Sequence, residues 1–160
     1  MPDFLQSLSE LYQAQLQRYR NRPFLRAAMA ACALVSVASG SVSFRHRVRV
    51  DRLMDTLDAL RVFDPHEGVE LFNQFVDALK ADPEAGHRHA LEVVADEVAH
   101  EPEKARLLGR ICLAVSQRDG VIPAAEWREV ASLCQCLGVA PTTCGLDEIV
   151  TSAGECGDGG

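Results

Sequence analysis

Two acidic side chains, Asp119 and Glu126, flank a turn and are the clearest candidates for chemistry in this sequence. Gly120 between them permits a sharp turn, and Pro123 can begin a new helix. Carboxylate oxygens, together with backbone carbonyls and waters, are the ligands that hard divalent cations prefer. The segment therefore predicts a metal site at Asp119 and Glu126 for a divalent cation. The residue types do not choose among calcium, magnesium, manganese and zinc, and they call for no organic cofactor.

The spacing of the two acids matches only half of a calcium-binding EF-hand loop. Counted back from Glu126 as the twelfth position of such a loop, Asp119 takes the fifth and Gly120 the sixth. Val115 and Gln117 stand where the first two oxygen ligands belong, which excludes a standard EF-hand. A purely structural role stays open, because Asp tolerates turn geometry and the dipole of the following helix favours Glu126.

A second copy of this segment lies upstream in the chain. Residues 31–50 align without a gap with residues 111–130, so that Ser39 and His46 take the places of the two acids. The upstream corner therefore cannot be a hard-oxygen site of the same kind. His46 stands among arginines, where we expect a solvated side chain rather than a zinc ligand with a partner from elsewhere.

Basic residues gather around the upstream corner although the whole chain has a net charge of -7. The negative net charge argues against a general nucleic-acid binder, because phosphate contacts need a clustered positive surface. We predict that the basic run contacts an acidic protein or lipid, with a solvated helix face as the alternative. The residues of this predicted partner-binding surface are Arg45, His46, Arg47, Arg49 and Arg52.

The cysteines and the short motifs do not point to an enzyme. No two of the 6 cysteines form a CxxC pair, and Cys32 and Cys112 fall on apolar faces that are typical of buried thiols. On a helix Cys134 and Cys136 would point about 200° apart, which disfavours a shared soft metal. The sequence offers no Ser-His-Asp spacing, glycine-rich phosphate loop or HExxH. A thiol-dependent enzyme is the remaining catalytic alternative.

The composition and the positions of the prolines predict an all-α fold. The chain is 48% hydrophobic but only 6% aromatic, and each of its 7 prolines stands where a helical pattern begins. We predict a single domain of seven to eight helices, with residues 1–22 as an N-terminal helical arm, residues 23–150 as the domain and residues 151–160 as a disordered tail. The predicted helices span about residues 2–19, 23–38, 44–60, 65–80, 83–100, 102–118, 123–137 and 141–150.

The internal alignment predicts how these helices are arranged. Residues 23–60 and 102–137 should form two helical hairpins related by a pseudo-twofold, and the helices between them should bridge the hairpins. Val42 and Ile122 are equivalent apolar residues in the two corner loops. We expect them to meet across the axis as a short strand-like contact.

Three segments together resemble a known family. They are residues 27–40, the turn at residues 62–64, and residues 111–140 with Asp119-Gly120 and Glu126. These residues resemble the tellurite-resistance TerB family over about residues 23–146. The resemblance implies an all-helical, pseudo-symmetric fold with acidic, metal-binding residues at both corners, and a role in resistance to tellurite and chemical stress.

The resemblance also implies partners and a location. It implies association with membrane-bound and calcium-binding proteins of a stress-response complex. We therefore expect a non-enzymatic bacterial protein that is cytoplasmic, peripheral at the inner membrane and not itself transmembrane. This sequence keeps the acidic pair of the family only at Asp119 and Glu126.

Overall fold

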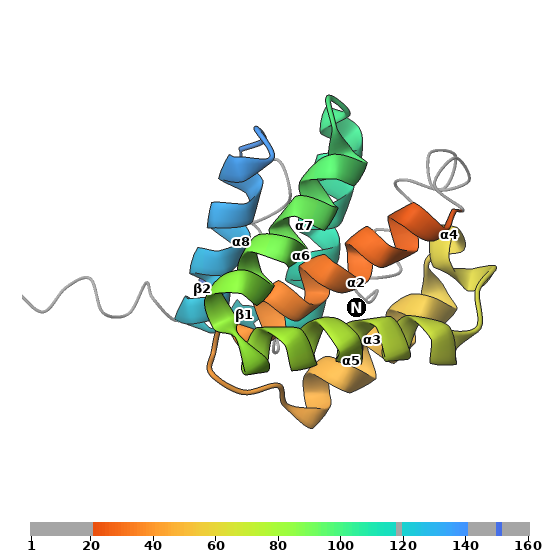
Figure 1. Cartoon of the computed structure of the whole chain (residues 1–160), viewed down its shortest axis with the longest axis horizontal. Coiled ribbons are helices and arrows are strands. Elements are labelled where there is room, and N and C mark those ends of the chain that lie inside the picture. Colours follow the sequence, from red (N-terminus) through yellow and green to blue (C-terminus); the bar gives the residue numbers. More distant parts are fainter. Residues whose placement is uncertain (1–20, 118–119, 141–149, 152–160) are drawn as a thin grey trace, which may run out of the picture.

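The computed structural model describes residues 21–117, 120–140 and 150–151, without the side chains of Asp58, Ala59 and residues 150–151. Helices dominate this part of the chain (Figure 1), which confirms the all-α prediction. Two short strands, β1 and β2, pair in parallel. The elements are α2 (Arg22–Val37), α3 (Phe44–Thr56), α4 (Asp58–Arg61), α5 (Pro65–Ala81), α6 (Pro83–Val98), α7 (Pro102–Ser116), β1 (Val121–Ile122), α8 (Ala124–Cys136) and β2 (Val150–Thr151).

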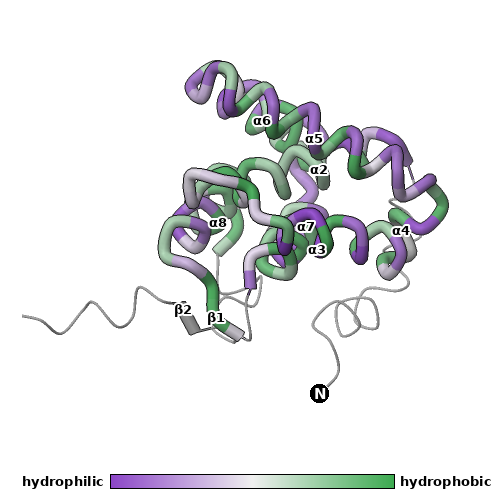
Figure 2. Tube along the Cα trace, turned by 90° about the horizontal axis from the view of Figure 1, so that it is seen from below, coloured by the Kyte–Doolittle hydropathy of each residue, from purple (hydrophilic) through white to green (hydrophobic). Residues whose placement is uncertain are grey.

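Helix α2 is the centre of the fold because it is apolar on nearly every side. Its residues from Phe24 to Ser36 are buried except for Arg26. It packs against α3, α5, α6, α7 and α8. Figure 2 shows α2 between a layer formed by α5 and α6 and a second layer that contains α3, α7 and α8. None of the described helices has the length and hydropathy needed to cross a membrane.

Polar caps and prolines fix where several helices begin. The side chains of Asn21, Asp64 and Asp82 accept hydrogen bonds from backbone N–H groups in the first turns of α2, α5 and α6 at 2.9, 2.9 and 3.2 Å. Each cap precedes a proline at the helix start, where a missing N–H costs nothing. The predicted starts of these helices are confirmed to within one residue.

The helix predicted over residues 44–60 is wrong at its C-terminal end. Helix α3 stops at Thr56, and Leu57 adopts an extended conformation with φ of -82° and ψ of 126° before the short helix α4. Both Leu57 and Leu60 are fully buried, so the break serves packing in the core. No glycine or proline marks the break in the sequence, and periodicity alone could not locate it.

The strand-like partner of Ile122 is also different from the prediction. Ile122 pairs with Thr151 and Val121 with Val150, so Val42 is not the ladder partner. Val42 is instead partly buried against the core. Residue 150, predicted to end the last helix, belongs to β2. The arm predicted at residues 1–22 and the tail predicted at residues 151–160 lie almost entirely outside the described residues.

The two corners resemble each other in their backbone. We call residues 39–46 the first corner and residues 119–126 the second corner. Gly40 and Gly120 stand at aligned positions and both have positive φ, 98° and 81°, which a glycine adopts without strain. The helices that follow, α3 and α8, begin and end at aligned positions. The internal duplication itself stays an interpretation of this likeness.

Candidate functional site

The two corners meet through buried polar side chains. Glu126, in the first turn of α8, is fully buried, and His46, in the first turn of α3, is 2% exposed. The His46 Nε2 atom lies 2.7 Å from Glu126 Oε1, although the two residues are 80 positions apart in the chain. The Ser39 hydroxyl donates to Glu126 Oε2 at 2.8 Å. We call Ser39, Ser43, His46 and Glu126 the corner joint.

The local structure of α3 determines which nitrogen of His46 carries a proton. The Ser43 backbone N–H donates to His46 Nδ1 at 3.0 Å as half of a capping box. A backbone N–H can only donate, so Nδ1 is the acceptor and Nε2 carries the proton of a neutral imidazole. His46 therefore donates through Nε2 to Glu126, and both carboxylate oxygens receive a neutral donor.

The charge of Glu126 has no cationic partner among the described residues. Its neighbours within hydrogen-bonding distance are the Ser39 hydroxyl and the His46 ring, and no described Arg or Lys forms an ion pair with it. Buried charges in proteins are normally paired or bound to a metal. A surface pair of the same type, His87 with Glu129 at 2.7 Å, is in contact with solvent and needs no such compensation.

The expectation that His46 is solvated was wrong. Because His46 is buried, it is also not part of the exposed basic surface on α3. Alignment with Glu126 marked the equivalence of the two positions, but no local signal in the sequence showed that either side chain is buried. Sequence reasoning also missed Ser43, although a serine three residues before a side chain that can accept its N–H is the pattern of a capping box. Asp119 lies outside the described residues.

The series Ser43, His46 and Glu126 superficially resembles a catalytic triad. The Ser43 Oγ atom lies 3.0 Å from His46 Nδ1, but the same Nδ1 already accepts the Ser43 backbone N–H. The Ser43 hydroxyl also accepts from the backbone N–H of His46 at 3.4 Å, as a helix cap does. The arrangement is that of a buried cap, since a nucleophile needs an exposed hydroxyl and a base that is free to take its proton.

The joint can hold a cation only if a further ligand joins it. Among the described residues, no group of three or more His, Cys, Asp or Glu side chains is arranged to hold a metal ion. Each oxygen of Glu126 accepts one hydrogen bond and has a second lone pair left. Among the described residues the joint therefore supplies one carboxylate, a hydroxyl and an imidazole N–H, and the second predicted ligand, Asp119, lies outside them.

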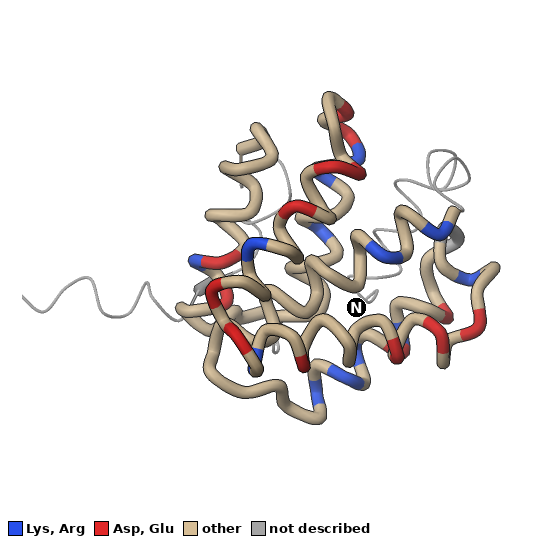
Figure 3. Tube along the Cα trace, viewed as in Figure 1, with Lys and Arg blue, Asp and Glu red and all other residues tan. Residues whose placement is uncertain are grey.

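The outer face of α3 combines arginines with exposed apolar side chains. Phe44 is 81% exposed and Val48 40% exposed, one turn apart. Arg45 beside them is exposed, whereas Arg47 donates a hydrogen bond to Asn73 of α5 and is less accessible. Figure 3 shows basic residues along α3, in a chain with acidic residues on several other helices. The arginines of this face were predicted from the sequence, whereas the exposed Phe44 and Val48 beside them were not.

The described cysteines differ in accessibility. Cys32, Cys112 and Cys134 are buried and Cys136 is exposed. Burial raises the pKa of the Cys32 thiol to about 12, so this thiol stays protonated and unreactive at neutral pH. The prediction of buried thiols at Cys32 and Cys112 is confirmed.

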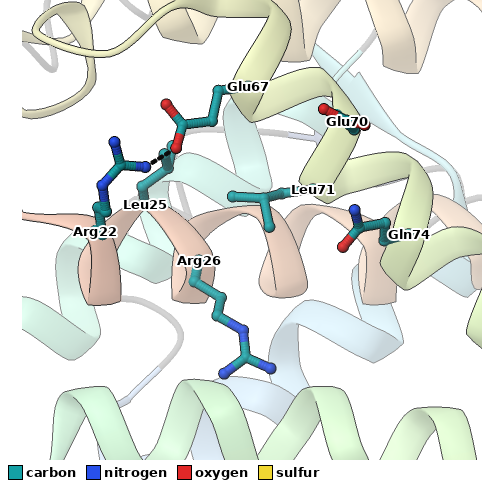
Figure 4. A pocket seen from close by; sticks show the side chains of 7 residues that line it. All are labelled: Arg22, Leu25, Arg26, Glu67, Glu70, Leu71 and Gln74. Carbon is teal, nitrogen blue, oxygen red and sulfur yellow. Dashed lines mark ion pairs between the residues drawn. The ribbon is translucent and has the colours of Figure 1, made fainter.

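A surface pocket of about 240 Å³ lies between α2 and α5 (Figure 4). Arg22 and Glu67 form an ion pair at its edge, and Leu25 and Leu71 supply apolar walls. Arg26 also lies over the ring of Phe75, 5.8 Å from its centroid. None of the predicted site residues that the structure describes lines this pocket.

Comparisons with known proteins agree with the resemblance found in the sequence. A family model described as tellurite resistance protein TerB matches residues 25–146, which contain both corners. The chain belongs to the TerB family. A TerB relative from Alcaligenes sp, named tellurium resistance protein TerB, is 31% identical over 97 residues, which are 61% of this chain and 79% of the relative. No solved structure matches the chain.

Proposed function

We propose that this protein is a non-enzymatic adaptor in tellurite resistance, and that a divalent cation held by Asp119 and Glu126 controls its state. Membership of the TerB family supports the role in resistance. The single observation that supports the cation is the fully buried carboxylate of Glu126, whose described partners are a hydroxyl and a neutral imidazole. A cation beside Glu126 would supply the missing positive charge.

The chemistry of the ligands narrows the choice of cation. Two carboxylates, backbone carbonyls and waters form the oxygen set that calcium, magnesium and manganese prefer. An imidazole among the ligands would favour zinc, but His46 Nε2 carries a proton in the hydrogen-bonded joint. The joint therefore favours an oxygen-bound cation of modest affinity.

Calorimetric titration with calcium, magnesium, manganese and zinc tests the cation directly. We expect heat of binding with wild-type protein and its loss in Asp119→Ala and in Glu126→Gln, which keeps the shape of the side chain but removes its charge. The matched control is Glu129→Gln, because Glu129 pairs with His87 on the surface in the same geometry. An absence of heat with all four ions would remove the cation from the proposal and leave the adaptor role.

A second candidate function is a metal-independent interaction module that uses the outer face of α3. The observation that favours it is the exposed Phe44 beside Arg45, since aromatic residues and arginines are the commonest anchors of protein interfaces. The partner would be an acidic protein or lipid of a membrane-associated complex. The two candidate functions differ in one respect: binding of a partner to this face would depend on a cation in the first and would be independent of it in the second.

A further inference from the structure

We propose that the first two turns of α3 dock on an anionic lipid bilayer and that the ring of Phe44 inserts among the lipid headgroups. The inference rests on the partner-binding face proposed above, names its partner and assigns its anchor. It requires no cation. Phe44 is 81% exposed in the first turn of α3, and Val48 in the next turn is 40% exposed.

Two neighbouring rows of side chains run along the outer side of α3. Residues four apart on a helix lie on the same face, so Phe44 and Val48 form a short apolar row. A basic row lies beside it and consists of Arg45, Arg49 and Arg52. An apolar row next to a basic row is the pattern of a helix that lies in the interface of an anionic membrane.

Charge selects the N-terminal half of the helix for this contact. Residues 44–50 contain three arginines and no acidic residue. Asp51 and Asp55 are exposed and lie in the C-terminal half, where they would be repelled by anionic headgroups. The half that carries Phe44 is therefore the half whose charge is complementary to such a surface.

The opposite side of α3 is already fixed to the rest of the protein. Val50, Leu53 and Met54 are buried in the core, and His46 contacts Glu126. Docking therefore uses side chains that have no place in the interior and requires no rearrangement of the helix.

The shape of the face favours a lipid surface over an acidic protein. A protein partner normally buries about 800 Å² on each side, around anchors that fill pockets. No residue of α3 lines the pocket between α2 and α5 or the smaller pocket of about 140 Å³ beside it, which includes His89. A bilayer offers an apolar phase without a preformed pocket. The arginines can keep their charged ends at the phosphates while their aliphatic stems lie along the apolar row.

Sedimentation with vesicles of phosphatidylglycerol and phosphatidylcholine, in the presence of a chelator, tests the insertion. Phe44→Ser removes the ring at an exposed position, and we expect the partition coefficient to fall about tenfold, because partial burial of such a ring is worth about that factor. The arginines remain, so the residual binding should still weaken with added salt. The matched control is Val62→Ser, since Val62 is 54% exposed beyond α4, and it should bind like wild-type protein.

Fluorescence gives a second measurement that reports on the ring itself. Trp127 is the only tryptophan in the sequence, so Phe44→Trp combined with Trp127→Phe carries a single probe on the first turn of α3. Its emission should move to shorter wavelength when anionic vesicles are added. The same change at the control position, Val62→Trp with Trp127→Phe, should leave the emission unmoved. Circular dichroism on each variant shows whether it is folded.

The outcomes separate this inference from the proposed function. Binding of Phe44→Ser as tight as that of wild-type protein, or unmoved emission of the Phe44→Trp variant, overturns the insertion and leaves the arginines as the contact. No binding of wild-type protein to the anionic vesicles, or equal binding to phosphatidylcholine alone, overturns the lipid partner. The cation of the proposed function is tested by calorimetry without lipid, so either proposal can fail while the other stands.

Discussion

At the scale of single residues, the environment of His46 differs most from what its residue type suggests. His46 is a histidine among arginines, and residue type alone favours a solvated side chain. The structure instead buries it, and its capping box and its contact with Glu126 satisfy both ring nitrogens. A buried polar side chain must find such partners, so the partner of one corner residue is found at the equivalent position of the other corner.

Cys32 provides a prediction at the same scale. Burial raises the pKa of its thiol from 9.0 to about 12. A thiol whose pKa is higher in the folded state than in the unfolded chain stabilises the folded state fully at any pH below its unfolded pKa. This stabilisation is lost as the pH rises from the unfolded pKa to the folded pKa. Between pH 9 and pH 12 the unfolding free energy of the wild-type protein should therefore fall relative to Cys32→Ala, by about 1.4 kcal/mol per pH unit.

Chemical denaturation of the two proteins at a series of pH values measures this difference. The expected result is a constant offset up to about pH 9, due to the small cavity in Cys32→Ala, after which the offset shrinks and then reverses in sign as the pH rises towards 12. Cys136→Ala is the control: because Cys136 is exposed, its replacement should leave the pH profile parallel to that of the wild-type protein. Parallel pH profiles for the wild-type protein and Cys32→Ala would show that the thiol ionises as easily in the folded state as in the unfolded one.

At the scale of helices, two glycines mark close approaches of different kinds. A Cβ atom on Gly86 of α6 would lie 2.7 Å from the backbone oxygen of Ala78 in α5. A Cβ on Gly68 of α5 would instead meet the side-chain end of Met54, at 2.3 Å from its sulfur. Backbone atoms of a packed helix cannot move aside, whereas a methionine side chain can adopt another rotamer.

The two substitutions to alanine should therefore differ in stability. Alanine favours a helix over glycine by about 1 kcal/mol, which partly offsets any clash. We expect Gly86→Ala to lower the unfolding free energy by about 1–3 kcal/mol, and Gly68→Ala to cost less. Thermal or urea denaturation of both variants measures the effect. If Gly86→Ala were as stable as the wild-type protein, α5 and α6 could move slightly apart at this contact without loss of stability.

The predictable part of the fold is the part with local signals. The prolines located the starts of α2, α5 and α6. The break at Leu57 and the pairing of Ile122 with Thr151 depend on contacts that are distant in sequence and have no local signal. In the candidate site, Glu126 was predicted from its spacing to Asp119 and Gly120. Its partners Ser39 and His46 were not predicted as such, because they are distant in sequence and reach Glu126 only in the folded chain.

At the scale of the whole molecule, the charge is unevenly distributed. The chain carries a net charge of -7, yet the outer face of α3 has a run of arginines with exposed Phe44 and Val48. At physiological ionic strength charges are screened over about 8 Å, so a surface that approaches α3 senses these arginines more than the distant acids. The face can therefore attract an anionic surface that the molecule as a whole would repel.

Vesicle binding tests whether this face acts independently of net charge. We expect salt-sensitive binding to vesicles of phosphatidylglycerol and phosphatidylcholine, weakened about tenfold or more by Arg45→Glu with Arg49→Glu, because each arginine near an anionic membrane contributes about 1 kcal/mol. The control is Arg88→Glu with Arg128→Glu, which changes the net charge equally on α6 and α8. Equal losses in both double variants would attribute binding to net charge. No binding by wild-type protein would leave an acidic protein as the partner of the face. A loss specific to Arg45 and Arg49 would place the lipid contact on the first two turns of α3, the helix whose His46 contacts Glu126.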